Sequence, residues 1–285
     1  MDPRTRPYRS VLYIPASKAR ALDKARGLAA DGIIFDLEDA VTPAEKVNAR
    51  DTLADELSKG GYGERVRLVR INGFDTEWGR DDARAVADME CDAVLLPKVE
   101  TTAQLDELAA ITGDLPIWAM METPLGMLNA ASIATHPKLQ GMVMGTNDLA
   151  KELQTRFRPD REPMLTSLSL CLLAARAHGL VIIDGVYNAF KDDEGLLVEC
   201  VHGRDMGFDG KSLIHPAQLE VTNKAFAPSD EEIDLSRRQI AAFEETEAAG
   251  QGVAVVDGRI VENLHVATAR EILAKAEAIA AMHGS

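Results

Sequence analysis

The chain alternates short apolar runs with stretches of helical periodicity, and this alternation constrains its fold more than any other feature. The runs are rich in β-branched residues and nearly continuously apolar, which is typical of parallel strands covered on both faces by helices. Each run is therefore a predicted strand of a parallel α/β sheet. The predicted strands are Val11–Pro15, Gly32–Leu37, Arg67–Ile71, Ala93–Pro97, Pro116–Met121, Gly141–Gly145, Leu180–Asp184 and Gly207–Ile214.

Eight strands separated by helices predict a closed (β/α)8 barrel of the TIM type. The stretches between them place apolar residues three and four apart, as the outer helices of a barrel do. A doubly wound open sheet is the alternative, but neither GxGxxG nor GxxxxGK[ST] follows the first strand, where a nucleotide-binding open sheet carries one. The clearest predicted helices are Ser17–Ala30, Pro43–Lys59, Thr102–Thr112 and Glu194–Met206.

The pattern changes near Pro228, which predicts a barrel domain over residues 1–228 and an extension over residues 229–285. The extension would be a packing appendage, a lid or an oligomerisation arm. Its predicted parts are a helix capped by Ser229 and Asp230 that runs through Glu247, a turn or hairpin over Gly250–Gly258, and an alanine-rich helix over Ala267–Met282.

The charge balance argues against polyanionic partners. The chain has 46 acidic and 31 basic residues, a net charge of −15, which repels nucleic acid and anionic membranes. A local cluster of Lys and Arg could still bind a phosphorylated small molecule. Three cysteines without CxxC spacing indicate neither a disulfide framework nor a zinc site, and no signal peptide or membrane span is predicted. A cytoplasmic location fits these features best.

Polar residues gather where the predicted strands end, which is where barrel enzymes carry their catalytic groups. We therefore expect acidic and basic side chains to meet at one rim of the barrel. In chain order the strand ends carry Asp36, Glu38 and Asp39; Arg70 and Asn72; Lys98; Glu122; Asp148; Asp184; Lys211; and His215.

Glu122 and Asp148 are the predicted metal ligands. Several carboxylates at the mouth of an apolar barrel are unfavourable unless a cation holds them together. Two carboxylates with no His or Cys nearby favour Mg²⁺ or Mn²⁺ over zinc. The alternative is that both residues cap helices or pair with Arg70 and Lys98 in a structural network.

Arg70 directly follows a strand and is predicted to clamp a carboxylate or to stabilise a developing oxyanion. The alternative is a salt bridge to Asp36 or Glu38, and the two roles are compatible. Strand alternation puts Asp36 and Glu38 on one side, while Asp39 begins the loop. We assign these three carboxylates supporting roles behind the arginine.

Taken together, these motifs resemble the citrate lyase beta-subunit-like proteins of the HpcH/HpaI aldolase superfamily, which includes malyl-CoA lyases and thioesterases. The resemblance implies a barrel that binds Mg²⁺ and an acyl-CoA, and a homo-oligomer, trimeric or hexameric, whose tail closes over a neighbouring site. The motifs that carry it are residues 9–17 (RSVLYIPAS), 35–41 (FDLEDAV), 69–72 (VRIN), 96–100 (LPKVE), 122–126 (ETPLG), 145–149 (GTNDL) and 214–218 (IHPAQ).

Residue by residue, Glu122 and Asp148 match the family's metal ligands and Arg70 its essential arginine. Other matches concern coenzyme A. The implied contacts are Arg20 and Lys24 with the phosphates, and Ile214, His215 and Pro216 near the adenine and pantetheine. The alternative for Arg20 and Lys24 is an ordinary solvated helix face, and the alternative for His215 is a core histidine. Asn72 and Lys98, at strand ends, are further candidates for substrate binding.

Two departures from the family patterns bear on the reaction. Asp39 stands where the aldolases of free keto acids have a histidine, which disfavours that activity. In the tail, Glu262 stands where the CoA-ester lyases have an aspartate that exchanges a proton with carbon. A longer carboxylate changes that geometry and could instead activate a water molecule beside the thioester. Alternatively, Glu262 is a conservative change in a working lyase or a surface residue of the hairpin.

The resemblance, read with Glu262, implies Mg²⁺-dependent hydrolysis of (3S)-malyl-CoA, or a close 3-carboxy-3-hydroxyacyl-CoA, to malate and free coenzyme A. The tail also resembles the short thioesterases more than the longer lyases. The alternative is a lyase acting on malyl-CoA, β-methylmalyl-CoA or citramalyl-CoA by carbon–carbon cleavage. A CoA-ester sensor or an assembly subunit would not need the complete set of Glu122, Asp148 and Arg70.

Overall fold

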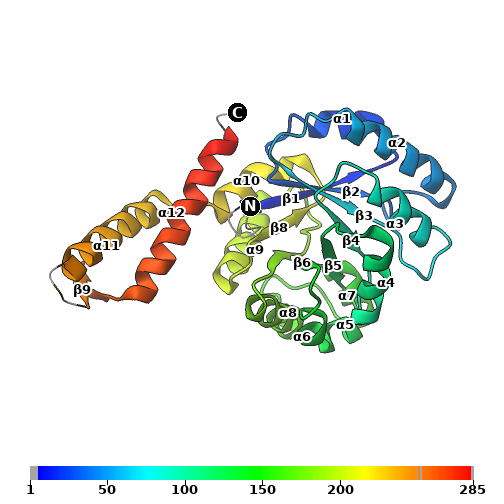
Figure 1. Cartoon of the computed structure of the whole chain (residues 1–285). Helices are drawn as coiled ribbons and strands as arrows, with labels where there is room; N and C mark the ends of the chain where they lie inside the picture. Colours follow the sequence, from blue (N-terminus) through cyan, green and yellow to red (C-terminus); the bar gives the residue numbers. More distant parts are fainter. Residues whose placement is uncertain (1–5, 249, 251, 284–285) are drawn as a thin grey trace. The chain divides into compact units, whose positions relative to one another are not determined.

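The computed structural model, which describes residues 6–248, 250 and 252–283, contains a closed barrel of eight parallel strands (Figure 1). The predicted TIM-type fold is confirmed. The barrel closes because β1 pairs with both β2 and β8. The strands are β1 Ser10–Pro15, β2 Gly32–Asp36, β3 Val66–Arg70, β4 Ala93–Leu96, β5 Ile117–Met121, β6 Leu139–Met144, β7 Val181–Asp184 and β8 Gly210–Leu213.

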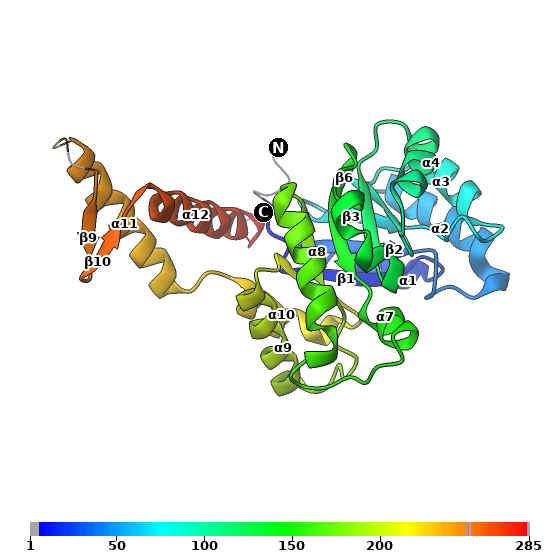
Figure 2. The same cartoon turned by 90° about the horizontal axis from the view of Figure 1, so that it is seen from below.

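Helices surround this barrel and connect its strands (Figures 1 and 2). The prediction for Thr102–Thr112 is confirmed at both ends: Thr101 and Gln104 form a capping box at its start, and Gly113, with a φ of 61°, follows its last residue. The helices are α1 Ala19–Ala25, α2 Lys46–Ser58, α3 Gly79–Ala87, α4 Thr102–Thr112, α5 Pro124–Leu128, α6 Ala130–Ile133, α7 Thr146–Glu152, α8 Leu165–Ala177, α9 Asp193–Met206 and α10 Leu219–Phe226, with short 3-10 turns η2 Pro43–Glu45, η3 Glu162–Met164 and η4 Pro216–Gln218.

Some predicted boundaries are wrong. The eighth strand begins at Gly210 rather than Gly207 because Gly207, with a φ of 107°, ends α9 in a left-handed conformation. The first helix is shorter than predicted and covers only Ala19–Ala25.

Strand alternation separates two apolar layers. One cluster fills the barrel and includes Val11, Ile34, Leu68 and Trp118. The other cluster packs between strands and helices and includes residues that alternate along the strands with those of the first cluster, such as Leu12. A polar residue that ends a strand in step with the inner cluster therefore faces the mouth of the barrel.

The described residues form two compact units, Tyr8–Phe226 and a second unit that begins at Ala227 and also takes in Arg6 and Pro7. The second unit contains α11 Asp230–Ala248, a hairpin of β9 Ala254–Val256 and β10 Arg259–Val261, and α12 Asn263–His283. Position 251, inside the predicted turn, lies outside the described residues. In the part of the chain that the structure describes, no helix is long and apolar enough to span a membrane.

The second unit has its own small core. Ser229 caps α11 as predicted, accepting a hydrogen bond from the Glu232 N–H at 3.1 Å. Asp257 and Gly258 both adopt positive φ and close the hairpin, which matches the twist of its two strands. The core residues are Phe243, Ala254, Val256, Val261 and Val266.

Candidate active site

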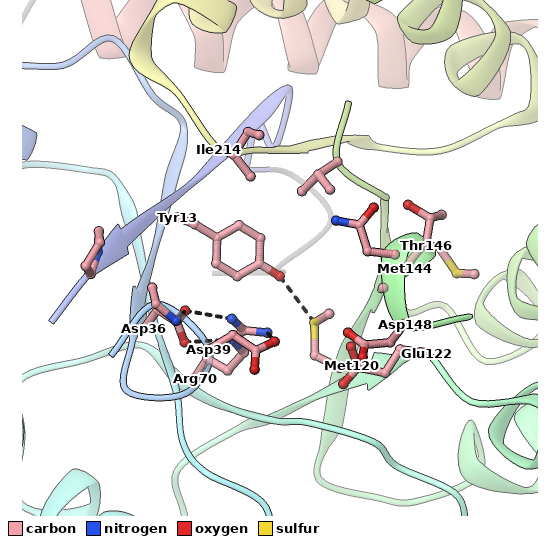
Figure 3. A pocket seen from close by; sticks show the side chains of 15 residues that line it. Tyr13, Asp36, Asp39, Arg70, Met120, Glu122, Met144, Thr146, Asp148 and Ile214 are labelled. Carbon is pink, nitrogen blue, oxygen red and sulfur yellow. Dashed lines mark hydrogen bonds and ion pairs between the residues drawn. The ribbon is translucent and has the colours of Figure 1, made fainter. Parts of the chain in front are cut away.

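A cavity of about 350 Å³ lies at the carboxyl ends of the strands (Figure 3). Its lining mixes carboxylates, one guanidinium, a phenol and two thioethers, so it can hold both charged and apolar parts of a ligand. The lining residues are Tyr13, Pro15, Asp36, Asp39, Ala40, Arg70, Met120, Glu122, Met144, Gly145, Thr146, Asn147, Asp148, Val186 and Ile214.

Arg70, at the end of β3, is buried and held by carboxylates. Its Nε and Nη2 donate to the two carboxylate oxygens of Asp36 at 2.7 and 2.6 Å (Figure 3). Glu38 Oε2 lies 2.7 Å from Nη1 without hydrogen-bond alignment, and Asp39 is 3.9 Å from the same nitrogen. The predicted ion pairs of Arg70 with Asp36 and Glu38 are therefore present, and Arg70 also lines the cavity.

This arrangement keeps Arg70 charged and fixed. Burial opposes ionisation, but the charges of Asp36 and Glu38 raise the pKa of Arg70 further above its ordinary value. Burial also opposes the ionisation of Asp36, yet the arginine beside it lowers the pKa of that carboxyl. Burial raises the pKa of Glu38 despite the same arginine. The guanidinium therefore offers a fixed positive charge to a ligand in the cavity.

Glu122 follows β5 and is 1% exposed. Its Oε1 accepts a hydrogen bond from the backbone N–H of Lys98 at 2.9 Å. A Cβ built at Gly145 would stand only 2.4 Å from Glu122 Oε2, so this glycine lets the carboxylate approach the start of α7. Burial raises the pKa of Glu122 to about 8, although the charge of Arg70 opposes the shift. A bound cation would favour the ionised form of Glu122 at neutral pH.

Asp148, half-buried in the first turn of α7, lines the same cavity as Glu122 (Figure 3). Neither carboxylate forms an ion pair with Arg70 or Lys98 among the described contacts. No group of three or more His, Cys, Asp or Glu side chains in the described part of the chain is arranged to hold a metal ion. Two carboxylates with open positions for water and substrate are nevertheless the usual protein share of a Mg²⁺ site, so the residues fit this ion.

Tyr13, Met120 and Met144 were not predicted as site residues. Tyr13 lies on β1 in step with Val11 of the inner cluster. Its ring lies under Arg70, with Cζ of the arginine 4.9 Å from the ring centroid. Burial raises the pKa of Tyr13, so its hydroxyl stays protonated. An aromatic residue inside an apolar run looks like core, and only its position in the alternation indicates the cavity.

Asn72 lies beside the site but not in the cavity lining. It is 2% exposed, and its amide donates to Asp82 at 2.6 Å and to the carbonyl of Leu37. The Lys46 ammonium donates to Asn72 Oδ1 and to the carbonyls of Leu37 and Glu38. Asn72 and Lys46 therefore hold the loop that carries Glu38, and the side chain of Asn72 is not available to substrate.

Lys98 is exposed and lines a neighbouring hollow of about 270 Å³ rather than the main cavity. Its φ of 50° turns the backbone N–H toward Glu122. Burial opposes its charge, but Glu38, Asp148 and Glu122 raise the pKa of the ammonium above its ordinary value. Lys98 therefore lies within the field of the acidic cluster.

The end of β8 contributes one residue to the cavity, Ile214. His215 is not a core histidine, because it is exposed and stacks on Phe190 with 4.5 Å between ring centroids. Its ring also accepts the Ala217 N–H and so caps the turn that begins at Pro216. This exposed pair of rings offers a stacking surface.

Arg20 and Lys24 lie one helical turn apart on α1 and are exposed. Neither lines the cavity, and the structure records no ion pair for either in its described part. The two cations therefore form an uncompensated basic pair on an otherwise acidic protein.

Asp184 and Lys211 do not join the rim. Lys211 Nζ lies 3.1 Å from Asp184 and 2.6 Å from Glu199 of α9, and Asp184 also binds Arg161. The expectation that they face the mouth is wrong because Ile183 belongs to the inner cluster, so the next residue points outward. This buried network ties β7 and β8 to α9.

Glu262 belongs to the second unit, between β10 and α12, and is exposed. Its backbone N–H donates to the ring of His265 at 3.1 Å. Its carboxylate is not among the residues that line the cavity.

Comparison with known proteins gives one consistent family. The profile described as HpcH/HpaI aldolase/citrate lyase matches residues 9–216. A (3S)-malyl-CoA thioesterase of Cereibacter sphaeroides is 67% identical and covers 98% of this chain and 98% of its own length. Citrate lyase subunit beta of Leuconostoc mesenteroides is 35% identical, covering 95% and 93% respectively.

Solved structures agree with this result. CitE of Mycobacterium tuberculosis in complex with magnesium, acetoacetate and coenzyme A is 33% identical with a TM-score of 0.80, over 96% of this chain and 99% of that one. A citrate lyase beta subunit from the same organism, complexed with oxaloacetate and magnesium, is 35% identical with a TM-score of 0.71, over 80% of this chain and 100% of that one.

Proposed function

Because the chain belongs to the HpcH/HpaI aldolase/citrate lyase family, we propose that its cavity hydrolyses (3S)-malyl-CoA to malate and coenzyme A. The thioesterase relative, similar over nearly the whole chain, supports this substrate. The observation that carries the proposal is the placement of Glu122 and Asp148 in one cavity with the fixed charge of Arg70.

In this proposal Glu122 and Asp148 hold Mg²⁺, with Mn²⁺ able to substitute because it also prefers oxygen ligands. The bound ion would supply a Lewis acid for the carboxylate and hydroxyl of the malyl group. The magnesium complexes of the two Mycobacterium tuberculosis relatives support this assignment. Asp36, Glu38 and Asp39 would fix Arg70 rather than touch the metal.

Arg70 would stabilise the charge that develops on the thioester oxygen. A water molecule adds to the thioester carbon and gives a proton to Glu262, while the carbonyl electron pair moves onto the oxygen. Collapse of this intermediate breaks the carbon–sulfur bond and releases the thiolate of coenzyme A, which then takes up a proton. Arg20, Lys24 and the exposed rings at His215 would bind the nucleotide end.

Glu262 would come from a neighbouring copy in a homo-oligomer. The hairpin and the start of α12 expose apolar side chains that a second copy can cover: Val255 is 65% exposed, Ile260 60% and Leu264 73%. Val255 and Ile260 pair across the hairpin, on the face opposite its core. Cys91, Cys171 and Cys200 are all free thiols, which suits a reducing cytoplasm; Cys171 and Cys200 are buried, and Cys91 is partly exposed.

A lyase is the second candidate, and the citrate lyase beta subunits among the relatives favour it. The same bound complex would break the carbon–carbon bond to give glyoxylate and acetyl-CoA. Arg70 would then stabilise the enolate, and Glu262 would return a proton to carbon.

The test follows free thiol and glyoxylate in parallel, using purified full-length protein with (3S)-malyl-CoA and Mg²⁺, and with a chelator as control. We expect metal-dependent thiol release without glyoxylate. Glyoxylate without thiol would make the protein a lyase. The absence of both products would overturn the proposal.

Glu262→Asp tests the tail residue in the same assay. Because the shorter carboxylate restores the lyase pattern, we expect hydrolysis to fall about tenfold or more and the ratio of glyoxylate to thiol to increase. Glu220→Gln, an exposed change on α10, serves as control. An unchanged ratio in Glu262→Asp would remove this residue from the mechanism.

A further inference from the structure

The cavity contains a hydrogen-bond donor that the proposed mechanism does not yet use, the hydroxyl of Tyr13. This hydroxyl makes one polar contact in the described structure, a 3.3 Å approach to the sulfur of Met120 (Figure 3). A thioether is a weak acceptor, so this half-buried phenol is poorly satisfied where it donates to it. A stronger acceptor entering the cavity would take this hydrogen bond.

The position of the hydroxyl indicates which acceptor that is. The ring of Tyr13 lies against the guanidinium of Arg70, with 4.9 Å between Cζ and the ring centroid. In Figure 3 the hydroxyl points across the cavity, toward the side on which Met120, Glu122 and Asp148 lie. An oxygen that sits between Arg70 and the two carboxylates therefore comes within reach of both donors.

Arg70 already serves two carboxylates, so a second donor would strengthen the hold on such an oxygen. A guanidinium has five N–H groups in a fixed fork. The Nε and Nη2 edge is committed to Asp36, and Glu38 lies 2.7 Å from Nη1. Oxyanion sites generally use two donors aimed at the developing charge.

Resting on the proposed function, we propose that Tyr13 donates the second hydrogen bond to the thioester oxygen that Arg70 stabilises. The hydroxyl keeps its proton throughout. As water adds to the thioester carbon, the electron pair moves onto the oxygen and both hydrogen bonds strengthen, and they weaken again when the carbon–sulfur bond breaks. Tyr13 is thus a catalytic residue whose effect is confined to the transition state.

Tyr13→Phe is the direct test, because it removes the hydroxyl and keeps the ring against Arg70. We expect kcat for thiol release to fall about 100-fold, with KM changed less than about threefold. The melting temperature should be retained, since the hydroxyl donates only to a thioether. Both thiol and glyoxylate are followed, so the loss is measured on whichever bond the protein breaks.

Tyr62→Phe is the matched control. Tyr62 is a buried tyrosine that, like Tyr13, lies under a guanidinium, with Arg26 Cζ 4.8 Å from its ring centroid, but its hydroxyl donates to the carbonyl of Leu22. We expect Tyr62→Phe to lower the melting temperature and to leave kcat within about threefold. This control separates the loss of a buried hydroxyl from the loss of a donor in the cavity.

Three results would overturn the inference. An active wild-type protein whose Tyr13→Phe variant keeps its kcat would reject Tyr13 and leave the proposed function intact. A higher KM with unchanged kcat would mean that the hydroxyl binds the ground state only. A wild-type protein that produces neither thiol nor glyoxylate would reject both proposals together.

Discussion

At the scale of single residues, the buried charged side chains of the cavity differ in how well they are paired. Arg70 and Asp36 satisfy each other through two hydrogen bonds. Glu122 has only the Lys98 N–H in the described structure, and its pKa is raised to about 8 by burial. A group in this state gains most from an added cation, which is why Glu122 is the most informative residue to change.

Magnesium binding should depend on pH through Glu122. Its carboxyl has a pKa of 4.5 when exposed and about 8 in the metal-free fold, so the protein loses stability as pH rises from 4.5 through 8. Mg²⁺ binds the ionised form, and affinity should therefore increase about 100-fold from pH 6 to pH 8.5 and then level off. Calorimetric titration at several pH values measures the affinity and the proton released.

Glu122→Gln should abolish this pH-dependent binding and reduce thiol release at least about 100-fold, because one metal ligand and its charge are lost. Glu220→Gln, which changes an exposed carboxyl on α10, should bind Mg²⁺ as the wild type does. Retained turnover in Glu122→Gln would contradict the metal assignment.

At the scale of elements, much of the fold could be predicted because apolar runs mark most of the strands and the stretches between them have helical periodicity. The ends were less predictable: Gly207 continues an apolar pattern but ends α9 with positive φ. Within the site, Arg70 at the end of β3 and Glu122 just after β5 are in step with the inner cluster and line the cavity. Asp184 is one residue out of step and pairs with Lys211 instead. Tyr13 escaped prediction because its ring fits an apolar run.

The Asp184 network should contribute to stability and not to metal binding. Asp184→Asn would remove the carboxylate that pairs with Arg161 and one of the two that pair with Lys211, which should destabilise the fold by about 3–5 kcal/mol. Urea denaturation of the metal-free protein measures this loss, and titration should give unchanged Mg²⁺ affinity. Asp160→Asn, in the exposed pair with Arg158, should leave the unfolding midpoint unchanged. A weaker Mg²⁺ site in Asp184→Asn would contradict this separation.

The basic pair on α1 should affect substrate binding. Arg20→Ala combined with Lys24→Ala should raise KM for malyl-CoA about tenfold and leave kcat unchanged, since charge-assisted hydrogen bonds to phosphate are lost. The control is Arg80→Ala with Arg84→Ala, which removes two exposed cations from α3. Equal KM values for the two double variants would show that α1 only carries general surface charge.

At the scale of the whole molecule, the residues that line the cavity and the glutamate proposed to activate water lie in different units of the chain. The barrel unit carries the cavity with Arg70, Glu122 and Asp148, while the unit that begins at Ala227 carries Glu262. The second unit has a small core and an exposed apolar face on its hairpin. In the proposed homo-oligomer, another copy of the same chain would supply Glu262 to the site.

Charge on the hairpin should therefore break the proposed homo-oligomer. Val255→Asp combined with Ile260→Asp places two charges at adjacent exposed positions and leaves the hairpin core intact. We expect a mass in light scattering that falls toward the 30.9 kDa of one chain, together with loss of thiol release. Val47→Asp, an exposed apolar residue on α2, should keep both the wild-type mass and the activity. An active monomeric double variant would contradict a shared site.

The conformation of Lys98 also limits how this protein can evolve. The hydrogen bond that orients Glu122 comes from the main chain, and the φ of 50° that directs it disfavours most side chains by about 1–2 kcal/mol. Selection at this position therefore acts on backbone shape as well as on charge. Glycine or asparagine could replace the lysine and keep the carboxylate in place, whereas proline would remove the donor and β-branched residues would strain the turn. The substitutions tolerated at this position would be those that can adopt a positive φ, rather than those that resemble lysine chemically.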